Sequence, residues 1–115
     1  NHEEAIQHYL SAELYDEACS LLNSLGRQLI KEARVSLFTS FYEKIPKQYI
    51  KKNPWIQYTY ARALEFSAKV YEAIEAYKES QRLFQKNNFK EHIKMINLSI
   101  FSIIHFFFLQ SLNIL

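Results

Sequence analysis

The chain has 115 residues, the size of one domain, and 49% of them are hydrophobic, which is enough for a buried core. One glycine and two prolines exclude most all-β and α/β folds, whose turns need glycine at positive φ, and predict an all-helical (all-α) chain. A formal charge of +2, with acids and bases intermixed, provides no strong field for nucleic acid. The single cysteine excludes an intrachain disulfide and fits a reducing, cytoplasmic compartment.

The first half of the chain predicts three helices followed by a short turn. Apolar spacing places them at about residues 3–13, 15–30, 32–44 and 47–52. The third helix ends at Ile45-Pro46, because the residue before proline is pushed out of the helical region. Gly26 lies inside the second helix, where we expect a kink or a close helix crossing. Cys19 lies among apolar residues of the same helix and is expected to be a small buried hydrophobe.

Two long antiparallel helices are predicted next. Asn53 and Pro54 have the pattern of an N-cap followed by proline at the first helical position. The helices run over about 54–67 and 70–86, and their very short link requires them to lie antiparallel. After a polar break at Asn87-Asn88, a last helix is expected to start near Phe89.

A short motif, a tyrosine followed by one or two acids and an alanine, starts two of these helices: Tyr15-Asp16-Glu17-Ala18 and Tyr71-Glu72-Ala73. This is how the second helix of a tetratricopeptide-type (TPR-type) hairpin begins, with a small residue at a close crossing and acids in the first turn. We therefore predict antiparallel helical hairpins in a TPR-like right-handed superhelix, an α-α solenoid. The expected packing positions are Ala18, Leu22, Ala61, Leu64, Ala73 and Tyr77.

The separation of the two copies exceeds the TPR period of about 34 residues, so an irregular array is expected. The interpretation is one TPR-like domain, 1–115, which begins at Asn1 and is taken as a piece of a larger protein. Residues 1–52 form an irregular helical linker, and 53–115 form a TPR-like hairpin plus an apolar final helix.

In such hairpins the first helix lines the concave face. The residues at ligand-facing positions would be Tyr58, Arg62, Glu65 and Phe66. Aromatic side chains in this region, with Trp55 and Tyr60 among them, suit either a binding groove or packing between helices, and both interpretations stay open.

The C-terminal tail carries no Lys, Arg, Asp or Glu from Met95 to Leu115. Two apolar stripes run along it: Ile93, Ile96, Ile100, Ile103 and Phe107, and then Phe101, Ile104, Phe108, Leu112 and Leu115. A solenoid helix packed on two sides needs this pattern, and we prefer that interpretation. A membrane segment at 95–115 and an out-of-frame end remain alternatives. The second stripe lacks a neighbour, so a homodimer through 93–115 is expected, with His105 as a core histidine.

No motif for chemistry is present. One glycine cannot build a P-loop or a dinucleotide fingerprint. The histidines His2, His8, His92 and His105 lack metal-ligand spacing. The acids lie at predicted helix starts or on a wet face, without the burial that acid–base catalysis needs. We expect no enzyme, and no catalytic, cofactor or metal site in this chain.

One ordered set of features resembles a known family. In chain order it comprises Tyr15-Asp16-Glu17-Ala18, Leu21-Leu22, Phe41-Tyr42-Glu43-Lys44-Ile45-Pro46, Tyr49-Ile50, Asn53-Pro54-Trp55, Tyr60-Ala61-Arg62-Ala63-Leu64 and Tyr71-Glu72-Ala73. This order resembles the helical linker and early repeats of MalT-like, LuxR-type bacterial transcription regulators, which are signal-transduction ATPases. The similarity spans about residues 4–85 and depends on Pro46, Pro54 and the alanines.

The resemblance implies a regulator in which ATP is bound by another domain and DNA by a helix-turn-helix at the far end, so this segment would contact neither. It would relay or sense a small-molecule effector and contact neighbouring domains or a protein partner. A generic TPR-type adaptor for a peptide or protein is one alternative. A helical protein anchored by a C-terminal membrane segment is the other.

Overall fold

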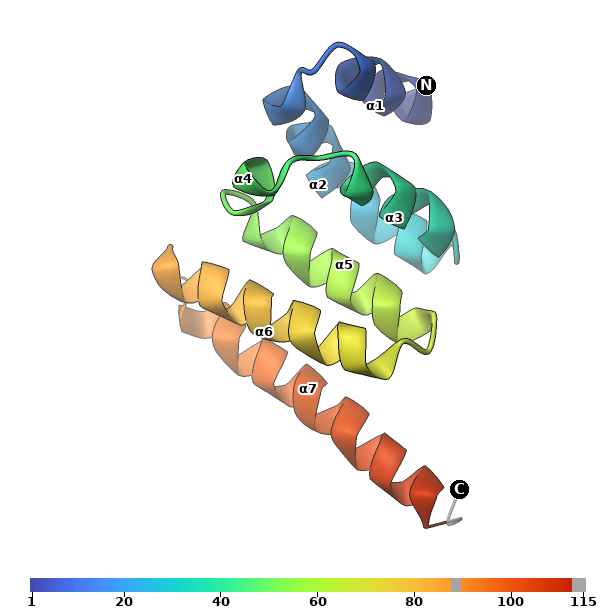
Figure 1. Cartoon of the computed structure of the whole chain (residues 1–115), viewed down its shortest axis with the longest axis vertical. Helices are drawn as coiled ribbons and strands as arrows, with labels where there is room; N and C mark the ends of the chain where they lie inside the picture. The colour runs from blue at the N-terminus through green and yellow to red at the C-terminus, as the bar shows by residue number, and fades with distance from the viewer. Residues whose placement is uncertain (88–89, 113–115) are drawn as a thin grey trace.

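Figure 1 shows the computed structural model, in which helices are stacked one after another along the longest axis. The structure describes residues 1–87 and 90–112, and the regular elements in those ranges are seven helices with no strand. They are α1 (His2–Ser11), α2 (Tyr15–Lys31), α3 (Val35–Glu43), α4 (Lys47–Ile50), α5 (Pro54–Phe66), α6 (Val70–Lys86) and α7 (Lys90–Ser111). The all-helical prediction is confirmed. The expected helix start near Phe89, the break at Asn88 and the end at Leu115 lie outside the described residues.

Three of the links between helices have the same backbone geometry. In each, one residue with a φ of 58° or 59° follows the helix cap: Glu13, Ala33 or Ala68. The next backbone N–H, from Leu14, Arg34 or Lys69, then donates to a carbonyl five residues back at 2.8–2.9 Å. These are Schellman-type ends that reverse the chain within three residues, here without the glycine usually found there.

The same geometry places three residues at equivalent positions in the helices that follow. The N–H groups of Ala18, Phe38 and Ala73 donate to the carbonyls of the three N-cap residues, and all three side chains are fully buried. Ala18 and Ala73 are the alanines of the repeated Tyr-acid-Ala motif. The structure therefore contains a third copy of the link, hidden in the sequence because a phenylalanine replaces the alanine.

Gly26 in α2 makes room for that phenylalanine. A Cβ atom at Gly26 would lie 2.9 Å from Cε2 of Phe38 and 3.5 Å from Cγ2 of Thr59 in α5. The expected close helix crossing is thus present, and it brings α2, α3 and α5 together. The absence of a side chain at one position allows a large ring at the other.

Helix α5 lies between two apolar clusters. Ile56 and Ala63 pack into the first cluster, with residues of α1 to α4. Ala61 and Leu64 pack into the second, with residues of α6 and α7. The six residues expected at packing positions (Ala18, Leu22, Ala61, Leu64, Ala73 and Tyr77) are all buried, and so is Cys19.

A buried polar residue joins three helices. Gln57, 4% exposed, accepts a hydrogen bond from the Tyr42 hydroxyl of α3 at 2.6 Å on its Oε1 atom. Its Nε2 atom donates to the Ala76 carbonyl of α6 at 3.2 Å. Gln57 stands where a TPR hairpin prefers a tryptophan, so its type alone gives no sign that it is buried. In the structure both ends of its amide are satisfied, as burial of a polar group requires.

Three local predictions are wrong. Helix α3 starts at Val35 rather than near residue 32, because Ala33 is left-handed and Arg34 takes the N-cap position. Asn53 precedes Pro54 as expected but makes no side-chain cap; its amide nitrogen donates to the Tyr49 carbonyl at 2.7 Å. His105 is exposed rather than buried, because it lies on the face of α7 turned away from α6.

Glycine at Ala68, one of the three left-handed positions, should stabilise the fold. Ala68→Gly is expected to raise the free energy of unfolding by about 0.5–1 kcal/mol, because φ of 59° strains any residue with a Cβ. Ala12→Gly, at a φ of −85°, is the control and should lower it, since only unfolded-state entropy is added. Urea unfolding measures both; equal losses would contradict the strain.

The crossing at Gly26 can be tested by filling it. Gly26→Val should lower the free energy of unfolding by about 1–3 kcal/mol, because the added atoms overlap Phe38. Ser20→Val, on the exposed side of the same helix, should change it by less than about 0.5 kcal/mol. Gly26→Val combined with Phe38→Ala should cost less than the sum of the two single changes. Simple additivity would show that the two positions do not share one space.

Candidate functional site

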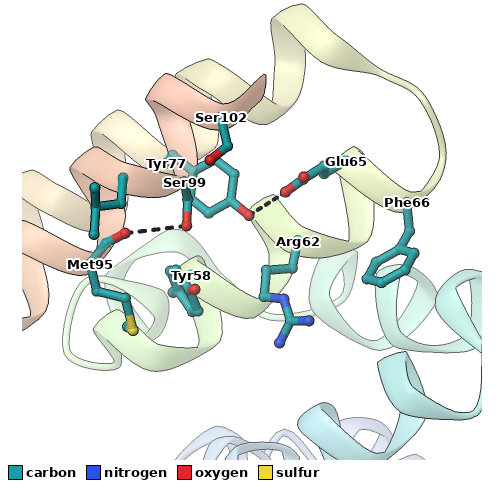
Figure 2. Close-up of a pocket in the computed structure, with 9 residues that line it drawn as sticks. Tyr58, Arg62, Glu65, Phe66, Tyr77, Met95, Ser99 and Ser102 are labelled. Atoms are coloured by element: carbon teal, nitrogen blue, oxygen red, sulfur yellow. Dashed lines mark hydrogen bonds between the residues drawn. The ribbon is translucent and has the colours of Figure 1, made fainter. Parts of the chain in front are cut away.

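The four residues expected to face a partner line one pocket on the surface. Tyr58, Arg62, Glu65 and Phe66 lie on a single face of α5, because residues three and four apart are neighbours on a helix. Figure 2 shows them opposite α7. The facing wall consists of Met95, Leu98, Ser99 and Ser102 from α7, and Tyr77 of α6 lies between the walls. We call this pocket, of about 650 Å³, the α5–α7 groove.

A hydrogen bond fixes the acid of the groove. The Tyr77 hydroxyl donates to Oε1 of Glu65 at 2.6 Å, as Figure 2 shows. Burial of the ring, followed by the neighbouring carboxylate, raises the pKa of Tyr77 above its usual value near 10. The phenol therefore stays neutral and remains a donor, and the carboxylate is held against α6.

The cations in and beside the groove are not neutralised in this way. Arg62 also lines a neighbouring hollow with Arg27 and Lys31 of α2, so that three cations lie along this side of the molecule. No ion pair joins any of the three to another residue that the structure describes. With Glu65 as the one acid among the lining residues, the side formed by α2, α5 and α7 is basic.

Aromatic rings accompany these cations. The guanidinium carbon of Arg62 lies 5.9 Å from the centre of the Phe66 ring, and that of Arg27 lies 5.9 Å from the centre of the Trp55 ring. Phe66 is 63% exposed. An exposed ring beside an arginine offers apolar contact area and charge together, which suits a peptide with acidic and apolar side chains.

Other chemistry has little support in the described part of the chain. Among the side chains that the structure describes, no group of three His, Cys, Asp or Glu could hold a metal ion. Burial raises the pKa of the Cys19 thiol to about 11, so it is a neutral thiol at physiological pH. Helix α7 has the length and composition of a membrane-spanning helix over His92–Ser111, the one such segment among the described residues.

The chain matches no protein-family model. No curated protein sequence and no solved structure matches it either. The resemblance to MalT-like regulators therefore stays a prediction, and function has to be argued from the groove.

Sequence spacing identified one wall of the groove and missed the other. The four α5 residues share a helical face, a pattern visible in the sequence. Ser99 and Ser102 lie in an apolar run, where nothing distinguishes a groove wall from a buried face. Arg27 and Lys31 come from a helix far away in the chain, and only the tertiary packing brings them beside Arg62.

The Tyr77–Glu65 contact predicts a pH-dependent contribution to stability. Tyr77→Phe should lower the free energy of unfolding by about 1 kcal/mol at pH 7, because one buried hydrogen bond is lost. In the wild type, the pKa of Tyr77 in the folded state is raised above the unfolded value of about 10. The free energy of unfolding of the wild type should therefore fall as the pH rises above 10. Above pH 10, the difference in the free energy of unfolding between wild type and Tyr77→Phe should then become smaller.

Thermal unfolding followed by circular dichroism from pH 7 to 11 measures this effect. Tyr71→Phe is the matched control, since Tyr71 is 75% exposed and its replacement should change nothing. A constant difference between wild type and Tyr77→Phe across the range would contradict the assignment.

Proposed function

We propose that this chain is a non-catalytic, TPR-like helical segment that binds an acidic, extended stretch of a protein partner in the α5–α7 groove. The observation that supports this most directly is the cluster of cations formed by Arg62 of the groove and by Arg27 and Lys31 of the neighbouring hollow. Arg62, Arg27 and Lys31 lie on one side of the molecule without ion-pair partners among the described residues, beside the exposed ring of Phe66.

The arrangement of the helices supports a TPR-like superhelix. Helices α5 and α6 form an antiparallel pair, and α7 follows beside α6, as the first helix of a further hairpin would. In such a superhelix the first helices of successive hairpins line the inner surface, which is where α5 and α7 face each other. The recurring three-residue link gives three of the reversals the same geometry.

Recognition would combine two contributions. Arginine guanidinium groups donate paired hydrogen bonds to carboxylates, and such charge-assisted bonds are stronger than neutral ones. Tyr58, Phe66 and Leu98 supply apolar contact for the intervening side chains. Glu65 is already bonded to Tyr77 and disfavours acidic residues at its own end of the groove, which would give the bound segment a direction.

The fuller form of the proposal follows the family resemblance. In a cytoplasmic MalT-like regulator, the bound segment would belong to a neighbouring domain of the same protein, and effector binding would shift the packing of this helical arm. A P-loop domain encoded upstream of Asn1 would support that form. An upstream sequence without one would favour a general adaptor.

The groove can be tested without knowing the partner. Random peptides displayed on phage are selected on the wild-type chain, and enriched peptides are then measured against Arg62→Glu by fluorescence anisotropy. Acidic peptides should be enriched, and Arg62→Glu should weaken them at least about tenfold, because a charge-assisted hydrogen bond is replaced by repulsion. Tyr58→Ala should weaken them as well.

Lys78→Glu is the matched control. It makes the same kind of charge reversal on an exposed site of α6 that does not line the groove. Enriched peptides that bind Arg62→Glu as tightly as they bind Lys78→Glu, or selection of peptides without acidic residues, would refute the proposed groove.

A further inference from the structure

We propose that the outer face of α7 is a self-association surface on which a second copy of this chain packs helix against helix. The surface is a row that we call the α7 seam: Leu98, Phe101, His105, Phe108 and Leu112. This inference concerns the side of α7 turned away from α6, and Leu98 is the one seam residue that also lines the groove.

The spacing of the seam is that of a coiled-coil contact. Its members follow one another at alternating intervals of three and four residues, the pattern that keeps one line of side chains facing a partner helix. The four apolar members are 52–65% exposed. A loose apolar patch would not need this regularity, whereas pairing with another helix does.

The other side of α7 is already occupied. Ile96 and Ile103 are buried, and Ile93 and Ile100 are partly buried, all against the cluster built on α6. The side-chain amides of Gln81 in α6 and Asn97 in α7 are also hydrogen-bonded. Four residues of the inner stripe predicted from the sequence are thus packed within the chain, whereas the fifth, Phe107, is 46% exposed with its ring against that of Tyr71 in α6. The outer stripe is open along the described length of the helix.

The open area approaches that of a stable interface. The four apolar seam residues and the adjacent Ile104 are 51–65% exposed, and His105 is exposed as well. Side chains of this size present roughly 600 Å² together. That is the upper end of what a typical monomer exposes as one patch, about 300–600 Å². A standard interface buries about 800 Å² on each partner. Flanking exposed residues such as Lys94 can supply the remainder.

A second copy fits this face better than a bilayer does. For α7 to span lipid, it would have to leave α6 and expose Ile96 and Ile103, or bring α6 with it. Helix α6 carries Glu75, Lys78, Glu79 and Arg82, whose charges are costly inside a membrane. A second α7 covers only the outer face and leaves the α6–α7 packing intact.

His105 occupies the middle of the seam. Its ring is stacked on that of Phe101, with centroids 5.8 Å apart and planes 8° from parallel. A single polar residue in an otherwise apolar seam selects one register and one number of strands, at some cost in affinity. This gives a role to a histidine that would otherwise be an unexplained interruption of the row.

Sedimentation equilibrium of the 115-residue chain, without detergent, tests the proposal. The expected mass is twice the 13.7 kDa of one chain at micromolar concentrations. Phe101→Ser combined with Phe108→Ser should produce a folded monomer, verified by circular dichroism. Phe66→Ser combined with Tyr71→Ser removes two exposed aromatic rings elsewhere and should remain dimeric.

His105→Leu provides a second measurement. It should tighten the dimer about tenfold or more, because a polar side chain no longer has to be desolvated in the seam. A monomeric wild type, a dimer unaffected by the two seam serines, or weaker association of His105→Leu would overturn the proposal. A chain that requires detergent or sediments with liposomes would overturn it in favour of a lipid partner.

Discussion

The structure depends on α5 being buried on two sides at once. Ile56 and Ala63 belong to the cluster of the first four helices, and Ala61 and Leu64 to the cluster of the last two. A helix has only a limited circumference, so two buried faces leave one stripe for solvent. The α5 side of the groove is that stripe. Gln57 lies between the clusters, and its two hydrogen bonds orient α3 and α6 about the same helix.

The helices and their order could be predicted from the sequence, because each long helix has a clear apolar period and Pro46 and Pro54 mark two ends. The start of α3 could not, since a left-handed alanine at position 33 looks like helix continuation. Burial of Gln57 and exposure of His105 also escaped prediction. Both are decided by which neighbour a helix face meets, and a uniformly apolar segment carries no sign of that.

Helix α7 takes part in two surfaces that share an edge. Leu98 lines the groove and also begins the α7 seam. A ligand in the groove and a second copy on the outer face would therefore contact opposite flanks of one side chain. By linkage, each would influence the affinity for the other to the same degree. The sign of that influence depends on whether one rotamer of Leu98 suits both.

The pair Gly26 and Phe38 shows how a repeat can persist in shape after its residues have diverged. At the other two corners the buried residue is Ala18 or Ala73. At this corner it is the much larger Phe38 of α3, and the space for its ring comes from Gly26 of α2, which has no side chain. A glycine inside a helix and a phenylalanine at an alanine position are each unusual alone, but together they fill one space. What the three corners share is therefore their backbone geometry, whatever the residue that fills each one.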